Sequence, residues 1–281
     1  MRDLFLINYF TLLIPSFVKV LWHRRELIWR LAQRDILSRY RGSLLGWAWT
    51  FINPLAMLAI YTFIFSQVFK AKWSSATGVD QGPLFFAINL FVGLIVFNQF
   101  SECFIKAPGI ILSNPNFVKK VVFPLEILPV VTVLSAFIHT VSSLIILIMF
   151  ELISKGGLKL EYGWLILVWL PMLLFCLSVT WLFSIVGVYF RDFSQISGVI
   201  TSALLFLSPV FFPLSALPLR FQAILALNPI AIMIEQTRRV TILGDHPSIL
   251  YLIMSIVLSI ITAELSFKIF MRIKPSFADM L

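Results

Sequence analysis

The sequence predicts an all-α integral membrane protein with six transmembrane helices, an N-terminal amphipathic interfacial helix and re-entrant helices before the last span. Composition predicts the class, because 60% of the 281 residues are hydrophobic and only 12% are charged. The mean hydropathy of +0.97 is higher than a soluble domain needs. A spanning helix takes about 20 mostly apolar residues, so several crossings fit and no large soluble domain remains.

The N-terminal region, residues 1–43, is predicted to lie at the cytoplasmic face of the membrane. Its apolar run before Pro15 is too short to span and lacks a small-residue cleavage site, so we expect no signal peptide. Apolar residues then recur at helical spacing among many arginines, which is typical of a helix in the headgroup layer. The candidate interfacial residues are Arg30, Arg34, Asp35, Arg39 and Arg41.

Six segments of the remaining chain, residues 44–281, have the length and apolar character of spans. They lie at about 44–69, 84–105, 125–153, 163–189, 194–212 and 248–270. An even number of spans places both termini on one side of the membrane. With that side cytoplasmic, cytoplasmic segments hold fifteen of the 22 Lys and Arg residues, so the positive-inside rule predicts cytoplasmic termini.

The segment over about 209–245 is apolar but contains Pro209, Pro213, Pro218 and Pro229. A proline inside a helix removes a hydrogen-bond donor and obstructs the preceding turn, so one straight helix is excluded. We expect short re-entrant helices that dip in from the outer face and frame the mouth of a pathway. A hydrophobic external loop packed on the spans is an equal alternative.

The stretch "SNPNFVKKVVFPLE", residues 113–126, separates two apolar spans on the cytoplasmic side. Asn114 is a favourable N-cap, Pro115 suits the first helical position, and Pro124 ends the helix. The sequence predicts a helix over about 115–123, which is too short to be stable alone in water and must dock. It packs either on its own spans or into a socket on a soluble partner. The candidate docking residues are Asn116, Phe117, Val118, Lys119, Lys120 and Val121, with Arg191 and Asp192 of the next cytoplasmic turn.

Two motifs carry a resemblance to a known family. "RDILSRYRGSLLGWAWTFINP" enters the first span and "NPNFVKKVVFPLEILP" opens the third, with the proline-broken segment before the last. Together, over essentially the whole chain, they resemble the permease subunit of type-2 ATP-binding-cassette exporters, which move O-antigen, capsule or teichoic acid chains. The resemblance implies a homodimer in the bacterial inner membrane that exports a lipid-linked polysaccharide, in the first place O-antigen. It also implies that the helix over 115–123 is a coupling helix, which transmits closure of a separate ATPase subunit to the spans.

The energy source follows from what the sequence lacks. No G-x-x-x-x-G-K-[ST] motif occurs, so no loop in this chain cradles phosphates. We therefore expect a permease that is not itself an enzyme and has no cofactor, with ATP and Mg on the partner subunit. The acidic residues of the spans lie toward the span ends. A proton or sodium relay needs ionisable residues near the middle of the membrane, so this placement argues against a gradient-driven carrier.

Two other functions stay open. One is a gradient-driven or passive channel or carrier. The other is a membrane transferase acting on lipid-linked sugars, which is disfavoured because His23, His139 and His246 are scattered without ligand spacing, so no metal site or catalytic group is predicted. The net charge of +9 indicates topology and contact with membrane lipids, and not nucleic acid.

Aromatic residues are the candidates for the substrate pathway, since the chain has 28 Phe, 8 Trp and 6 Tyr. Sugar rings have apolar faces, so aromatic rings along a conduit let a polymer slide without holding one register. Any single aromatic residue equally suits an interfacial belt or core packing. The predicted pathway residues are Trp47, Trp49, Phe51, Tyr61 and Phe65 on the first span, with Phe206, Phe211 and Phe212 near the outer mouth.

Overall fold

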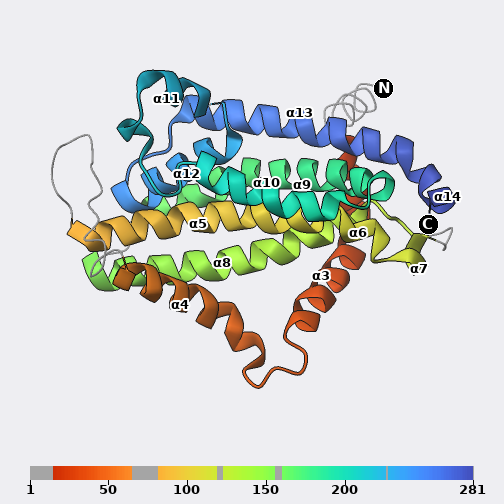
Figure 1. The fold of residues 1–281 in the computed structure, drawn as a ribbon, viewed down its shortest axis with the longest axis horizontal. Coiled ribbons are helices and arrows are strands. Elements are labelled where there is room, and N and C mark those ends of the chain that lie inside the picture. The colour runs from red at the N-terminus through yellow and green to blue at the C-terminus, as the bar shows by residue number, and fades with distance from the viewer. Residues whose placement is uncertain (1–14, 65–81, 119–122, 156–159, 226, 281) are drawn as a thin grey trace, which may run out of the picture.

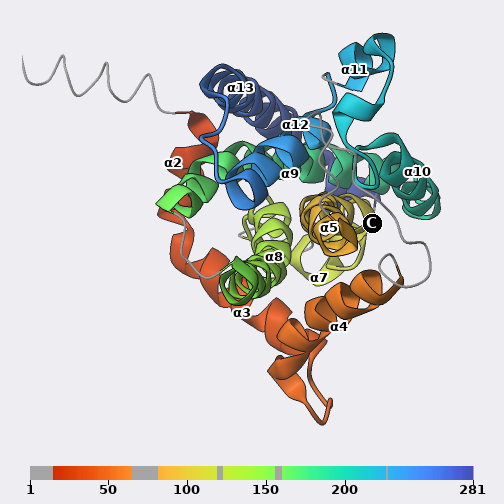
Figure 2. The same cartoon turned by 90° about the vertical axis from the view of Figure 1, so that its left-hand side faces the viewer.

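A computed structural model describes residues 15–64, 82–118, 123–155, 160–225 and 227–280 (Figure 1). Within these ranges every regular element is helical, which confirms the predicted all-α class. The long helices run side by side along the longest axis of the molecule. Seen from the end, α5 and α8 lie at the centre, with α9 and α13 on one side and α3 and α4 on the other (Figure 2).

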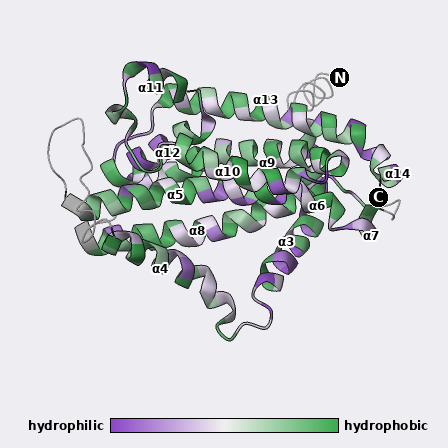
Figure 3. Cartoon of the chain, viewed as in Figure 1, coloured by the Kyte–Doolittle hydropathy of each residue, from purple (hydrophilic) through white to green (hydrophobic). Residues whose placement is uncertain are grey.

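Among the described residues, four helices are long and apolar enough to cross a membrane: α5 (Gly82–Lys106), α8 (Ile127–Lys155), α9 (Leu165–Tyr189, preceded by the 3₁₀ turn η3, Leu160–Trp164) and α13 (Ile249–Ile273). Helix α5 is buried along most of its length, whereas α13 packs on α9 and leaves Ile253, Val257 and Ile261 exposed. An exposed apolar face of this length is what a lipid-facing helix presents. The long helices are largely hydrophobic, and α3 carries a dense hydrophilic stretch (Figure 3).

Two further apolar helices, α4 (Trp49–Phe63) and α10 (Phe193–Leu207), are described over 15 residues each. Helix α10 is about 22 Å long at 1.5 Å per residue, against a hydrocarbon layer of about 30 Å, whereas the described residues stop one residue after α4. The predicted end of the fifth span at 212 is wrong, because Ser208 adopts extended backbone before Pro209 and stops α10. The first span begins with the 3₁₀ turn η1 (Gly46–Ala48), and its predicted end at 65–69 lies outside the described residues. The count of six spans therefore stays a prediction.

The N-terminal region forms two helices where one was predicted, α2 (Ser16–His23) and α3 (Arg25–Arg39), separated at Arg24. Helix α3 leans across the bundle and packs against α8, with Ile28, Leu31 and Ile36 buried and its arginines exposed. The apolar side of α3 is thus directed against protein, and its place at a membrane surface stays a prediction.

The proline-containing segment after α10 forms short helices, as predicted: η4 (Leu214–Ala216), α11 (Leu219–Leu225), α12 (Pro229–Arg238) and the π-helical turn η5 (Arg239–Leu243). Asn228 caps α12 by accepting a hydrogen bond from the amide of Ile230 at 3.0 Å, and Pro229 takes the first helical position. Helix α12 packs on α5 and α9, whereas α11 exposes Leu219 and Phe221. Whether these helices re-enter a membrane stays a prediction.

The opposite end of the bundle carries α6 (Gly109–Leu112), α7 (Pro115–Val118), the 3₁₀ turn η6 (Lys274–Ser276) and α14 (Phe277–Met280) (Figure 1). We call it the α7 end. Helices α11 and α12 lie at the other end, so the two segments singled out by their prolines occupy opposite ends of the bundle.

Candidate substrate cavity and coupling surface

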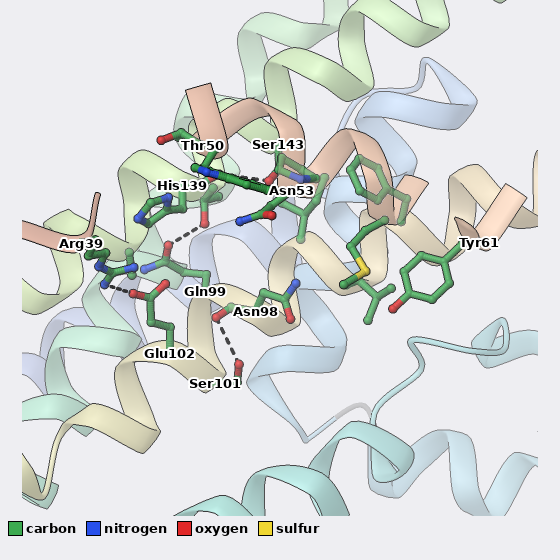
Figure 4. A pocket seen from close by; sticks show the side chains of 18 of the residues that line it. Arg39, Thr50, Asn53, Tyr61, Asn98, Gln99, Ser101, Glu102, His139 and Ser143 are labelled. Carbon is green, nitrogen blue, oxygen red and sulfur yellow. Dashed lines mark hydrogen bonds and ion pairs between the residues drawn. The ribbon is translucent and has the colours of Figure 1, made fainter. Parts of the chain in front are cut away.

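A cavity of about 640 Å³ lies between α4, α5 and α8, beside the end of α3 (Figure 4). Although the surrounding helices are apolar, most of the side chains that face it are polar. The polar lining residues are Arg39, Tyr40, Thr50, Asn53, Tyr61, Asn98, Gln99, Ser101, Glu102, His139, Thr140 and Ser143, joined by the indole of Trp49. A volume of this size is typical of a site for a small molecule or for part of a larger one.

Helical periodicity directs these side chains into the cavity. Asn98, Gln99 and Glu102 on α5 follow a spacing of one and then three residues, and His139, Thr140 and Ser143 on α8 repeat it. Residues three and four positions apart share one face of a helix. The hydroxyl of Thr140 donates to the side-chain oxygen of Gln99 at 2.7 Å, which joins the two polar faces.

Helix α4 is tied to this polar wall through its backbone. The hydroxyl of Ser142 donates to the carbonyl oxygen of Thr50 at 3.0 Å and to that of His139 at 2.7 Å. Because Thr50 lies in the first turn of α4, this contact fixes the start of α4 against α8.

Charged residues border the cavity toward the α7 end. Arg39 of α3 forms an ion pair with Glu102 of α5, and Lys106 lies 2.9 Å from the same carboxylate. Asp35 lies 4.0 Å from Arg39, and the hydroxyl of Tyr40 lies 3.3 Å from Nδ1 of His139. The end of α3 is therefore bound to the wall of the cavity.

The structure brings together only part of the predicted aromatic set. Trp49 and Tyr61 line the cavity. Trp47 of η1 and Phe51 of α4 are exposed, with their rings edge to face at 6.2 Å. At the end of α10 the exposed Phe206 stacks on Phe211 at 5.6 Å, and Phe212 is half-buried. Phe65 lies outside the described residues.

Sequence reasoning missed the polar face of the cavity. It treated the acidic residues of the spans, Glu102 among them, as residues near span ends, and His139 as one of three scattered histidines. The available signal was the matching spacing of polar side chains in two apolar spans, Asn98, Gln99 and Glu102 in one and His139, Thr140 and Ser143 in the other. A search limited to aromatic and ionisable residues does not detect that pattern.

Helix α7 holds the described part of the predicted docking segment. The ring of Phe117 stacks on Phe123 at 4.1 Å, and the guanidinium of Arg34 lies 5.8 Å from the centre of the Phe117 ring. Val118 is buried and Asn116 is exposed. Lys119, Lys120 and Val121 lie outside the described residues. Within α7, Asn116 is thus exposed, while Phe117 packs on its own chain.

The α7 segment is seated closely on the bundle. A Cβ added at Gly187 of α9 would lie 2.0 Å from the carbonyl oxygen of Pro108, so the turn before α6 rests directly on this glycine. Asn114 donates its side-chain amide to the carbonyl of Ile110 at 2.9 Å, which binds the start of α7 back to α6.

The next turn at this end carries the last two predicted docking residues. Asp192 is exposed, and Arg191 donates to the carbonyl of Met280 in α14 at 3.5 Å. The α7 end is therefore a surface built from several elements and not a free loop.

Comparison with known proteins agrees with this architecture. Residues 26–242 match the ABC-2 type transporter family. The O-antigen export system permease protein RfbA of Klebsiella pneumoniae is 25% identical over 261 residues, which cover 91% of this chain and 95% of that protein. The protein of the same name from Myxococcus xanthus is 30% identical over 222 residues, covering 75% and 78%. The polysialic acid transport protein KpsM of Escherichia coli is 23% identical over 212 residues, covering 75% and 79%. Since the family match spans well over half of the sequence, the chain belongs to the ABC-2 type transporter family.

Proposed function

We propose that this chain is the transmembrane subunit of an ATP-driven exporter that moves a lipid-linked polysaccharide, O-antigen in the first place, out of the cytoplasm across the bacterial inner membrane. The observation that carries the proposal is the cavity of hydroxyl, amide and aromatic side chains inside an apolar bundle. Such side chains suit a sugar, which presents both hydroxyls and apolar ring faces. Relatives matched over most of the chain are export permeases for O-antigen and a transport protein for polysialic acid.

The conduit is a homodimer in this proposal. Helix α10 is shorter than a bilayer, and both α4 and α10 carry exposed aromatic and aliphatic residues, among them Phe51, Leu55 and Phe206. A second copy facing them covers these side chains and encloses the cavity between two chains. The aromatic residues predicted for the pathway then line its wall, with Phe211 and Phe212 toward the outer mouth framed by α11 and α12.

The α7 end faces the cytoplasm and docks on a separate ATPase subunit, which binds ATP and Mg. Its contact residues are those over Asn116–Val121, together with Arg191 and Asp192. Support comes from the exposure of Asn116 and Asp192 and from the close seating of α6 on α9, which suits a segment that transmits force. Residues 1–43 and 44–281 act as an interfacial region and a permease domain.

Co-purification with the ABC ATPase subunit of the same transporter tests the docking surface. Replacing Asn116 with Arg puts a long charged side chain on an exposed position of α7, and we expect ATPase recovery to fall at least tenfold. The matched control is Arg220→Glu, an exposed change on α11 at the other end, which should leave recovery unchanged. Equal recovery with both variants, or loss only with the α11 variant, would contradict the proposed orientation.

A further inference from the structure

Two buried polar atoms in the cavity wall lack a hydrogen-bond partner among the residues that the structure describes. The hydroxyl of Thr50 and Nε2 of His139 have no hydrogen-bond partner in the part of the chain that the structure describes. Both residues line the cavity, Thr50 from α4 and His139 from α8 (Figure 4). A buried polar atom without a partner costs about 1–3 kcal/mol, so both atoms are available to bond a ligand hydroxyl group or water.

The neighbours of His139 determine which of its atoms a ligand meets. The hydroxyl of Tyr40 lies 3.3 Å from Nδ1 of His139, so Nε2 is the ring nitrogen that a ligand can bond. Thr140 and Gln99 bond to each other at 2.7 Å, so the Gln99 oxygen is already engaged. The buried polar atoms of the cavity wall that lack a hydrogen-bond partner in the described residues therefore belong to Thr50 and His139.

Charge in the cavity is balanced. Among the lining residues that the structure describes, the charged ones are Arg39 and Glu102, and they pair with each other. Just outside, Lys106 adds to Glu102 at 2.9 Å and Asp35 to Arg39 at 4.0 Å, which gives two cations and two anions in one cluster. A polyanion finds no spare cation here, and it would have to break an existing ion pair to gain one.

Taking the proposed function as given, we propose that this cavity binds uncharged, hydroxyl-rich sugar residues of the polymer, with Thr50 and His139 as hydrogen-bonding residues. Trp49 and Tyr61 supply ring surface for the apolar faces of the sugar. The site discriminates by charge, since it favours a neutral polysaccharide over an acidic one.

The test is equilibrium binding of a fluorescently labelled neutral O-antigen oligosaccharide to the purified complex of permease and ATPase, with polysialic acid of equal length as the acidic comparison. Thr50→Val removes the hydroxyl at constant volume, and His139→Phe removes the ring nitrogens. Each should weaken binding of the neutral oligosaccharide about tenfold, as loss of one hydrogen bond predicts. His139→Gln, which keeps an amide for hydrogen bonding, should recover much of the loss.

The matched control is Thr62→Val. Thr62 lies on the same helix and its hydroxyl is also buried without a partner in the described chain, but it does not line the cavity. It should leave binding unchanged and shows that a variant of this kind folds. Unchanged binding in Thr50→Val and His139→Phe would mean that the site holds water only, and tighter binding of polysialic acid would overturn the charge rule.

Failure of the two proposals is distinguishable. Suppose that the wild-type complex exports polysaccharide on ATP hydrolysis and that the Thr50 and His139 variants bind and export equally well. The proposed sugar-binding site is then wrong, and the proposed exporter function is retained. If the wild-type complex exports no polysaccharide, the proposed function is wrong, and loss of oligosaccharide binding in both variants would still support the site. If the wild type neither binds nor exports, both proposals fall.

Discussion

The ammonium of Lys274 lies 2.7 Å from the carboxylate of Glu126, and the side chain of Glu126 is almost fully buried. Glu126 directly precedes α8 and follows the segment that holds α7, whereas Lys274 stands at the end of α13. The indole of Trp181 in α9 donates to the backbone carbonyl of Glu126 at 3.1 Å. One residue next to the proposed coupling segment thus contacts three of the four long helices.

Glu126→Gln should separate nucleotide hydrolysis from transport. The change leaves Lys274 without its carboxylate, and the loss of one partner of a buried pair costs about 3 kcal/mol. We expect a lower midpoint of thermal unfolding and at least a fivefold drop in polymer exported per ATP hydrolysed, with ATPase co-purification retained. Transport and ATP turnover measured in the same proteoliposomes check this.

Exchanging the two charges is the control for that prediction. Glu126→Lys alone should be worse than Glu126→Gln, because it places two cations together. The double variant with Lys274→Glu should recover part of the loss. Defects that simply add in the double variant would show that the two residues act separately.

Gly187→Ala should destabilise the α7 end. The added methyl group would lie 2.0 Å from the Pro108 carbonyl, so the backbone of α6 or α9 must move. Overpacking of this kind costs about 1–3 kcal/mol, which should appear as a lower unfolding midpoint and weaker ATPase binding.

Gly198→Ala in α10 is the matched comparison. Apart from the local backbone of α10, no described atom lies within 4 Å of the added Cβ, and alanine favours a helix over glycine by about 1 kcal/mol. We expect this variant to be as stable as the wild type or more so. A larger loss at Gly198 than at Gly187 would refute the close seating of α6 on α9.

Arg238→Met should loosen the segment that follows α10. The buried guanidinium donates to the carbonyls of Asn89, Pro209 and Val210 at 2.7 to 3.1 Å, so it joins α12, α5 and the break after α10. Its removal leaves these carbonyls short of donors, at a cost of at least about 2 kcal/mol. Hydrogen exchange of residues 208–213 should rise, while the same change at the exposed Arg239 should leave it unaltered.

Local rules account for the ends of elements where a proline or a cap decides them. Helix α7 begins at Pro115, the first helical position that the sequence predicted, and Asn228 with Pro229 begins α12 in the same way, although no start was predicted there. The error at the end of α10 has the same origin, because hydropathy extends the span to 212 while Pro209 stops the helix at Leu207. When the two signals conflict, backbone geometry takes precedence over hydropathy.

The cavity could not be located from the sequence in the same way. Gln99 and Thr140 are 41 positions apart, and nothing local shows that their helices face each other. Phe117 likewise has an apolar face that either a partner or its own chain can cover, and the stacking on Phe123 depends on how the chain returns after α7. Such contacts follow from helix packing and not from any property of one segment.

The most direct test of the central claim is transport of labelled lipid-linked polysaccharide across proteoliposomes that contain this chain with and without its ATPase subunit. The account predicts export only when both subunits and hydrolysable ATP are present, because this chain forms the conduit and the partner supplies the energy. Export by this chain alone without nucleotide, or ATP hydrolysis by this chain alone, would contradict it.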